Sequence, residues 1–288
     1  PPAACNSSGI AVSILQMSGR LFDAHNHLQD ERLGPDRETL IAASRAEAIS
    51  AMVVNGSCEA DWPSVFELSR RFPEVIPSFG YHPWYVRERT PEWQHRLNEF
   101  LDQAPSALGE IGLDRWIKHP DIAAQEDAFV TQLRMAAHRE IPVSIHCLQA
   151  WGRLHDLLNN NPRPACGFVL HSFGGPEEMA PALAKLGAYF SLPGYFAHER
   201  KARQRDTFRK VPLDRLLIET DAPDQNLPPD RVRHPLPNGP DGKPMNHPAN
   251  LRSVYEFASE LLDIPLQELI NLIEQNFLRL FGRFVRTP

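Results

Sequence analysis

Five histidines and two carboxylates stand at the ends of short apolar runs that are spread over almost the whole chain. They are His25, His27, His82, Glu110, His146, His171 and Asp221. Each follows a β-type run and precedes a polar or Gly/Pro segment. Imidazole and carboxylate are ligands that zinc- and manganese-class ions take in proteins. Their repeated placement at strand ends predicts a catalytic metal site at the carboxyl end of a parallel barrel.

Six of these residues are too many for one four-coordinate zinc, so we expect two divalent ions, magnesium, manganese or zinc. Glu110 comes from mid-chain between glycines and is the natural bridge between the ions. His25 and His27 alternate on one strand face, and with Asp221 they would complete one shell. His146 and His171 would complete the other.

The expected chemistry is hydrolysis by a hydroxide that bridges the two ions at neutral pH. Asp221 would accept the proton of the attacking water and pass it to the leaving group. His82, in Gly-Tyr-His-Pro, would contact a substrate phosphate or carbonyl as a donor, or would only pack beside the ligands. Asp23, Asp114 and Glu219 would orient imidazoles or anchor the barrel ends.

The elements that must position these residues alternate regularly between strand and helix signals. The expected strands are Leu21–His27, Ala51–Gly56, Val75–Tyr81, Ala107–Leu113, Pro142–Cys147, Gly167–Phe173, Ala188–Leu192 and Leu216–Asp221. Helix-length stretches lie between them, for example Arg37–Ser50 and Ile122–Arg139. Eight such units predict an α/β fold, a TIM (β/α)8 barrel, whose alternative is a doubly wound open sheet.

A single domain over residues 20–286 is expected, and residues 1–19 read as a disordered N-terminal extension without the features of a signal peptide. The tail from Ala249 to Phe284 predicts two amphipathic helices, the eighth outer helix and one extra. Between them and the last strand, Asp224 to His247 holds six prolines and two glycines. A loop of this length is usually functional or disordered, and this one would edge the site.

Composition restricts the class of protein. The 30 basic and 36 acidic residues give a net charge of −6, so no global basic field collects nucleic acid. Four separated cysteines and no apolar run long enough to span a bilayer fit a protein of the reducing cytoplasm. No obligate protein partner is evident.

Two local features favour a polyanionic substrate. Seven Lys or Arg residues lie between Glu199 and Arg215, and Arg200, Lys201 and Arg203 come directly after the seventh strand. Trp62, Trp84, Trp116 and Trp151 follow strands and could stack unpaired bases. Both features could also be structural, as a solvated helix face and as loop packing.

Six ordered motifs carry a family resemblance. They are Asp-x-His-x-His, Gly-x-His-Pro, Gly-Glu-Ile-Gly-Leu-Asp, Pro-Val-x-Ile-His-Cys, His-Ser-Phe-x-Gly and Glu-Thr-Asp-Ala-Pro. From Leu21 to Phe281 the chain resembles the TatD family of metal-dependent deoxyribonucleases. The resemblance implies an amidohydrolase-like TIM barrel with two divalent metals, held by the six ligands given above. Departures follow the last strand, at Asn246-His247-Pro248, and the sixth, at Gly174-Gly175; both lie near the mouth and leave substrate choice less defined.

The leading hypothesis is therefore a two-metal deoxyribonuclease that trims single-stranded DNA from its 3′ end, with Asp221, Glu110 and His82 in catalysis. The alternative is a metal-dependent hydrolase of carbonyl substrates, such as an aminoacyl-tRNA deacylase, esterase or amidohydrolase. The same ligands serve both reactions, and the cations or apolar groups of the mouth would distinguish them. A non-catalytic barrel is disfavoured because no expected ligand is missing.

Overall fold

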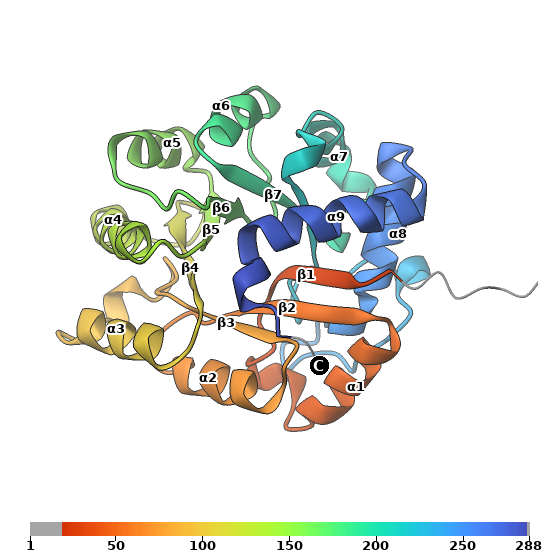
Figure 1. Ribbon diagram of the computed structural model, residues 1–288, viewed down its shortest axis with the longest axis horizontal. Coiled ribbons are helices and arrows are strands. Elements are labelled where there is room, and N and C mark those ends of the chain that lie inside the picture. Colours follow the sequence, from red (N-terminus) through yellow and green to blue (C-terminus); the bar gives the residue numbers. More distant parts are fainter. Residues whose placement is uncertain (1–18, 287–288) are drawn as a thin grey trace, which may run out of the picture.

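Eight parallel strands, each hydrogen-bonded to the next in chain order, form one sheet in the computed structural model, which describes residues 19–286. The strands are β1 (Leu21–Asn26), β2 (Ile49–Asn55), β3 (Val75–Phe79), β4 (Ala107–Asp114), β5 (Val143–Leu148), β6 (Phe168–Leu170), β7 (Ala188–Pro193) and β8 (Leu216–Glu219). The helices are α1 (Arg37–Ala46), α2 (Trp62–Arg71), α3 (Trp93–Gln103), α4 (Ile122–Arg139), α5 (Trp151–Asn160), α6 (Ala180–Lys185), α7 (Ala202–Phe208), α8 (Leu251–Leu262) and α9 (Leu266–Phe281). Figure 1 shows the helices arranged around the strands.

The barrel closes where the end of β8 meets β1. The Asp221 amide donates to the His25 carbonyl over 3.0 Å, and the His27 amide donates to the Ala222 carbonyl over 2.7 Å. The buried Asp23 carboxylate accepts from the amide and the hydroxyl of Thr220, at 3.0 and 2.5 Å. The predicted TIM barrel is confirmed, because an open sheet would leave these edges apart.

The interior of the barrel is apolar toward the amino-terminal ends of the strands. One buried cluster joins inward side chains of the strands to the last helix and the segment after it: Phe22, Ala51, Ile76, Val169, Leu217, Phe277, Leu280, Phe281 and Phe284. Phe22 and Phe277 stack with 4.7 Å between ring centroids. The predicted extra C-terminal helix is therefore present as α9, which lies across the amino-terminal end of the barrel and closes it (Figure 1).

Local signals explain where several helices begin. Asp36 caps α1 by accepting from the Thr39 amide over 3.0 Å, and Asp121 caps α4 by accepting from the Ala124 amide over 3.0 Å. Such caps contribute about 1 kcal/mol each. They fix where each helix begins after the loop that follows the preceding strand, residues 27–36 after β1 and residues 115–121 after β4.

The sequence predicts two segments without regular secondary structure, the N-terminal extension and the loop after β8. Of the expected N-terminal extension, residues 1–18 lie outside the described residues, while Gly19 is buried against Ile270. The loop from Asp224 to His247 contains a short 3-10 turn and one antiparallel bridge, Pro235 to Asn246. Near its start Gln225 contacts Asp221, and near its end Asn246 donates to the Thr220 carbonyl; between them Arg233 and His234 are tied to Asn250, just before α8.

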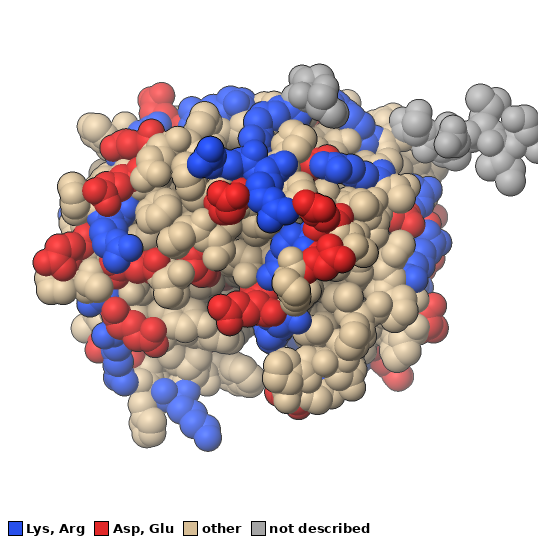
Figure 2. Space-filling model, turned by 90° about the horizontal axis from the view of Figure 1, so that it is seen from below, with Lys and Arg blue, Asp and Glu red and all other residues tan. Residues whose placement is uncertain are grey.

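No helix within residues 19–286 is long and apolar enough to cross a membrane. Figure 2 shows basic and acidic side chains interspersed over the face seen there. This mixed surface agrees with the net charge of −6 and leaves any polyanion binding to local features.

Candidate metal centre

The seven residues singled out from the sequence lie together at the carboxyl ends of the strands. They come from β1, β4 and β5 and from the segments after β1, β3, β6 and β8. All except His27 are at most 8% exposed. A polar cluster this deeply buried needs internal partners, because burial without them is costly.

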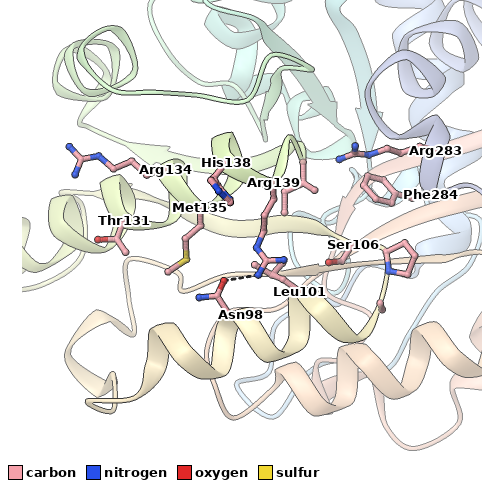
Figure 3. A pocket seen from close by; sticks show the side chains of 13 residues that line it. Asn98, Leu101, Ser106, Thr131, Arg134, Met135, His138, Arg139, Arg283 and Phe284 are labelled. Carbon is pink, nitrogen blue, oxygen red and sulfur yellow. Dashed lines mark hydrogen bonds between the residues drawn. The ribbon is translucent and has the colours of Figure 1, made fainter.

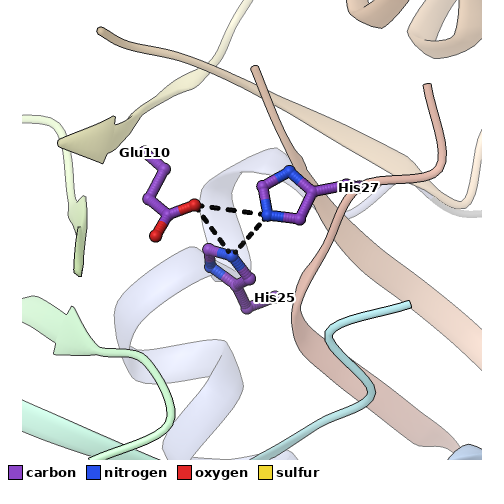
Figure 4. Close-up of side chains that lie close together, drawn as sticks. All are labelled: His25, His27 and Glu110. Carbon is purple, nitrogen blue, oxygen red and sulfur yellow. Dashed lines mark hydrogen bonds and ion pairs between the residues drawn. The ribbon is translucent and has the colours of Figure 1, made fainter. Parts of the chain in front are cut away.

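One group surrounds one oxygen of Glu110. Glu110 Oε2 lies 3.4 Å from His25 Nε2 and 3.2 Å from His27 Nε2. Asp221 Oδ1 lies 3.6 and 3.7 Å from the same two nitrogens. Figure 4 shows the side chains of His25, His27 and Glu110 pointing toward one another. Two imidazoles and two carboxylates thus face one small volume.

A second group surrounds the other oxygen. Glu110 Oε1 lies 3.0 Å from His171 Nε2, 3.1 Å from His146 Nδ1 and 3.5 Å from His82 Nε2. The rings of His25 and His171 stack at 4.1 Å between centroids, so the two groups are adjacent. Glu110 presents one oxygen to each group, and ligand atoms of His25, His171 and Asp221 also lie within 4.8 Å of one another.

The electrostatics of the cluster fit a bound cation. Glu110 Oε1 is buried and accepts no hydrogen bond, although three histidine nitrogens face it. Burial alone would raise the pKa of Glu110, but the positive charge of His171 is the largest of the interactions with neighbouring histidines that hold that pKa well below its usual range. Burial lowers the pKa of His25 to about 4, which keeps this imidazole neutral, the form that coordinates metals.

For His25, His27 and His146, the nitrogen turned away from the cluster is held by a partner. His25 Nδ1 lies 2.7 Å from Ser144 Oγ, and His27 Nδ1 lies 2.8 Å from the Asn55 carbonyl oxygen. His146 Nε2 lies 3.0 Å from Asp114 Oδ2. Partners of this kind fix the tautomer and direct the lone pair of the opposite nitrogen toward the cluster.

Asp221 is held at one oxygen and left open at the other. Its Oδ2 accepts from Gln225 Nε2 over 2.6 Å, while Oδ1 faces the two histidines of β1. The residue has a φ of 53°, in the left-handed region that is uncommon for residues other than glycine. Burial raises the pKa of Asp221, so its carboxyl can hold a proton more readily than an exposed aspartate.

The sequence alone leaves open whether Asp23, Asp114 and Glu219 orient imidazoles or anchor the barrel ends. Their contacts in the structure differ. Asp114 contacts an imidazole, as described above. Asp23 contacts the backbone and side chain of Thr220 and the backbone of His25, so it anchors the closing seam. Glu219 accepts from the amide and hydroxyl of Ser172, at 2.7 and 2.5 Å, and its Oε1 lies 3.7 Å from His171 Nδ1.

Sequence reasoning missed several supporting residues. Ser144 is two positions before His146 on β5, so strand alternation could have found it. Asn55 ends β2 as the histidines end other strands. Gln125 of α4 brackets Asp114 by accepting from its amide and donating to its carbonyl, at 2.9 and 3.0 Å. No local signal marks Gln225.

Of the four tryptophans that follow strands, two are exposed and two are wholly or partly buried. Trp84 and Trp116 are 50% and 68% exposed. Trp62 is fully buried and donates from Nε1 to the Gly80 carbonyl, so the packing alternative holds for Trp62. Trp151 is half-buried and packs on Phe173 at 4.9 Å between ring centroids.

The basic segment after β7 is partly used by its own loop. Arg205 donates to the carbonyls of Phe196 and His198, at 2.9 and 2.6 Å. Arg200 donates to the Tyr195 hydroxyl over 2.7 Å and lies over its ring, as does Lys201. Arg200 and Lys201 thus lie against Tyr195, and they are the first cations in the sequence after β7.

A cavity of about 990 Å³ lies at the other end of the barrel, between α3, α4 and the C-terminal segment (Figure 3). Ala104, Pro105 and Ser106, which line it, precede β4, and Ile141 precedes β5. Arg139 crosses it to donate to Asn98 over 2.8 Å. None of the potential metal-binding groups of the described residues includes a residue of this cavity, so the cavity is separate from the candidate metal centre.

Comparison with known proteins agrees with this geometry. A family model described as TatD related DNase matches residues 22–282. The chain is 29% identical over 266 residues to the uncharacterized metal-dependent hydrolase YabD of Bacillus subtilis, covering 91% of this chain and 98% of that one. It is 32% identical over 242 residues to the 3′-5′ ssDNA/RNA exonuclease TatD of Cronobacter sakazakii, covering 83% and 91%.

Among solved structures, the Escherichia coli TatD homologue YjjV superposes with a TM-score of 0.81 and 26% identity, covering 92% of this chain and 99% of that one. Fold, ordered motifs and buried ligand cluster thus agree along nearly the whole chain. The protein belongs to the TatD-related DNase family and is a metal-dependent hydrolase.

Proposed function

We propose that this hydrolase is a 3′–5′ exonuclease on single-stranded DNA ends and that it uses two divalent ions. The observation that carries the two-ion proposal is the division of Glu110: one carboxylate oxygen faces His25 and His27, the other faces His146 and His171. A single ion would leave one of these groups without a cation.

In the proposed assignment His25, His27, Glu110 and Asp221 hold one ion, and Glu110, His146 and His171 hold the other. When bound, such ions make water available as a nucleophile near neutral pH and stabilise the charge that develops on a phosphodiester. The protein's part is to fix the ligands in a buried site.

Asp221 is the proposed proton acceptor. Gln225 holds Oδ2, so Oδ1 is the oxygen available at the cluster. A carboxylate whose pKa is raised by burial is better matched to taking and returning a proton near neutral pH than an exposed one.

His82 is the proposed donor to the substrate. Its Nδ1 accepts from the Trp84 amide over 3.2 Å, and burial lowers its pKa to about 4. A neutral imidazole that accepts at Nδ1 carries its proton on Nε2, the nitrogen that faces the cluster. His82 would therefore donate to a phosphate oxygen rather than coordinate an ion.

The choice of a nucleic acid strand rests on the mouth and on the exonuclease name of the Cronobacter relative. Arg200 and Lys201 follow β7, and exposed tryptophans follow β3 and β4. Cations and aromatic rings together are the usual means of holding single strands. Cys58, Cys147 and Cys166 are free thiols, which fits a reaction in the cytoplasm.

The test gives metal-loaded enzyme a 5′-labelled single-stranded oligonucleotide, the same sequence as a blunt duplex, a panel of carboxylic esters and an aminoacyl-tRNA. We expect a ladder shortened from the 3′ end, formed faster from the single strand. The Glu110→Gln variant, purified in the same way, controls for contaminating nuclease and should give no ladder. Ester or aminoacyl hydrolysis with the oligonucleotide intact would instead establish the carbonyl-hydrolase alternative.

A further inference from the structure

Large exposed apolar side chains gather on one side of the mouth. Four are found in the described residues, and three of them lie at the carboxyl ends of consecutive strands: Trp84 after β3, Trp116 after β4 and Leu148 at the end of β5. The fourth, Leu213, precedes β8 at the other end of the barrel. An exposed apolar patch beside a buried polar site marks a surface that receives a ligand.

A single carboxylate ties this patch to the metal centre. Asp114 Oδ2 accepts from Trp84 Nε1 over 2.6 Å and lies 3.0 Å from His146 Nε2. Asp114 Oδ1 accepts from the Trp116 amide over 2.7 Å. Asp114 itself is fully buried and bracketed by Gln125. The two tryptophans and a proposed ligand therefore share one rigid anchor.

Trp84 is fixed in orientation but not covered. Its Nε1 is bonded inward, and its ring meets that of His82 edge to face, at 5.0 Å between centroids and 88° between planes. Half of its surface is nevertheless exposed. A ring already held in one orientation loses little conformational entropy when a planar group stacks on it.

We propose that Trp84 and Trp116 form a subsite for the unpaired base at the 3′ end of the strand, with Asp114 as the positioning residue that aligns this subsite with His146. The proposal rests on the proposed function and specifies its substrate as a strand whose last base is free to stack. Arg115 and Lys118 are exposed on the same loop as Trp116 and supply positive charge for the backbone. A paired terminal base would have its base-pairing edge and one face engaged in the duplex.

The first test compares two single-stranded oligonucleotides that differ only in the 3′-terminal residue, which carries a base or an abasic tetrahydrofuran. Stacking on an aromatic side chain corresponds to roughly 5- to 150-fold in affinity. We expect Trp116→Ala to raise KM about tenfold for the base-carrying strand and to leave the abasic strand unchanged. Leu213→Ala, the matched control, should change neither. An equal loss on both strands would overturn the subsite.

The second test separates positioning from simple structural damage. Trp84→Phe keeps an aromatic face and loses the bond to Asp114, whereas Asp114→Asn weakens the anchor itself. We expect Asp114→Asn to lower kcat on both strands and, in addition, to reduce the preference for the base-carrying strand severalfold. Trp84→Phe should retain more of that preference than Trp84→Ala. An unchanged preference in Asp114→Asn would remove its positioning role.

A binding measurement keeps this inference distinct from the hydrolytic proposal. Thymidine 5′-monophosphate should quench tryptophan fluorescence of the full-length protein, and Trp84→Ala with Trp116→Ala should abolish that quenching. Quenching without DNA hydrolysis would retain the base subsite and reject the nuclease. Hydrolysis of DNA without quenching or base preference would reject the subsite and retain the nuclease.

Discussion

For His146, the nitrogen that faces Glu110 depends on the partner of the other nitrogen. His146 presents Nδ1 because Asp114 takes Nε2, whereas His171 presents Nε2. Both atoms end 3.1 and 3.0 Å from the same carboxylate oxygen. The two imidazoles therefore converge although they enter from different strands with different geometry.

Asp221→Asn tests the proposed proton acceptor. The amide oxygen can still coordinate, but the amide cannot take a proton from water, so we expect turnover to fall well below a tenth of the wild-type value. A tenfold loss corresponds to about 1.4 kcal/mol in the barrier. Single-turnover kinetics, with circular dichroism and metal analysis to verify the fold and at least one bound ion, would measure this.

Asp224→Asn is the matched control for that variant. Asp224 lies three residues later, is half-exposed at its side chain and pairs with Arg32 at 2.6 Å. Its activity should stay within about twofold of wild type, because exposed ion pairs contribute little. If Asp221→Asn retains more than a tenth of wild-type turnover, another group accepts the proton.

Among single residues, the sequence predicts those that lie at the end of a recognisable strand. It does not predict residues that reach the site through contacts between distant segments. His25, His146 and His171 could be chosen because a histidine at the end of an apolar run is unusual. Gln225 could not, because its contact with Asp221 depends on the path of an irregular loop. The burial of Trp62 could not be predicted either, since its Nε1 partner is a carbonyl of a neighbouring loop.

Among the elements, the close approach of β4 and β5 is what brings Glu110 and His146 together. Gly112 of β4 has a φ of 155°, and a Cβ there would lie 1.9 Å from the His146 carbonyl oxygen. A side chain at this position would push the two strands apart. Glycine is therefore a requirement of the site as much as of the fold.

We expect Gly112→Ala to destabilise the protein by about 2 to 4 kcal/mol, from overpacking and backbone strain together, and to weaken metal binding. Urea unfolding and metal titration would measure both. Gly152→Ala is the control: Gly152 lies in α5 with nothing within 4 Å of a built Cβ, so alanine should be neutral or slightly stabilising. Equal stability of the two variants would contradict this account of β4 and β5.

The strand and helix pattern could be predicted closely, and its ends less so. The helix Ile122–Arg139 was predicted with both ends correct, since Asp121 caps it. The sixth strand was predicted as Gly167–Phe173 but spans only Phe168–Leu170. Ser172 takes a φ of 45°, which turns the chain out of the sheet, and apolar pattern alone does not reveal this turn.

In the whole molecule the two ends of the barrel differ in polarity: one is lined by polar side chains and the other by apolar ones. The carboxyl end holds the buried ligand cluster, and the amino end is closed by Phe277, Leu280 and Phe281 of α9. The sequence predicts that this last helix is amphipathic but not which surface its apolar face covers. The closing contacts of β8 with β1 involve His25 and Asp221 themselves, so completing the barrel also assembles the site.

The central claim is that this cluster hydrolyses single-stranded DNA only with divalent metal bound. The most direct measurement is the rate of 3′-end shortening of a labelled single strand by one enzyme preparation before chelation, after exhaustive chelation and dialysis, and after addition of Mn²⁺. We predict that the activity is lost on chelation and restored by the metal in the wild type, and is not restored in Glu110→Gln. Full activity in the chelated enzyme, or equal restoration in Glu110→Gln, would contradict the account.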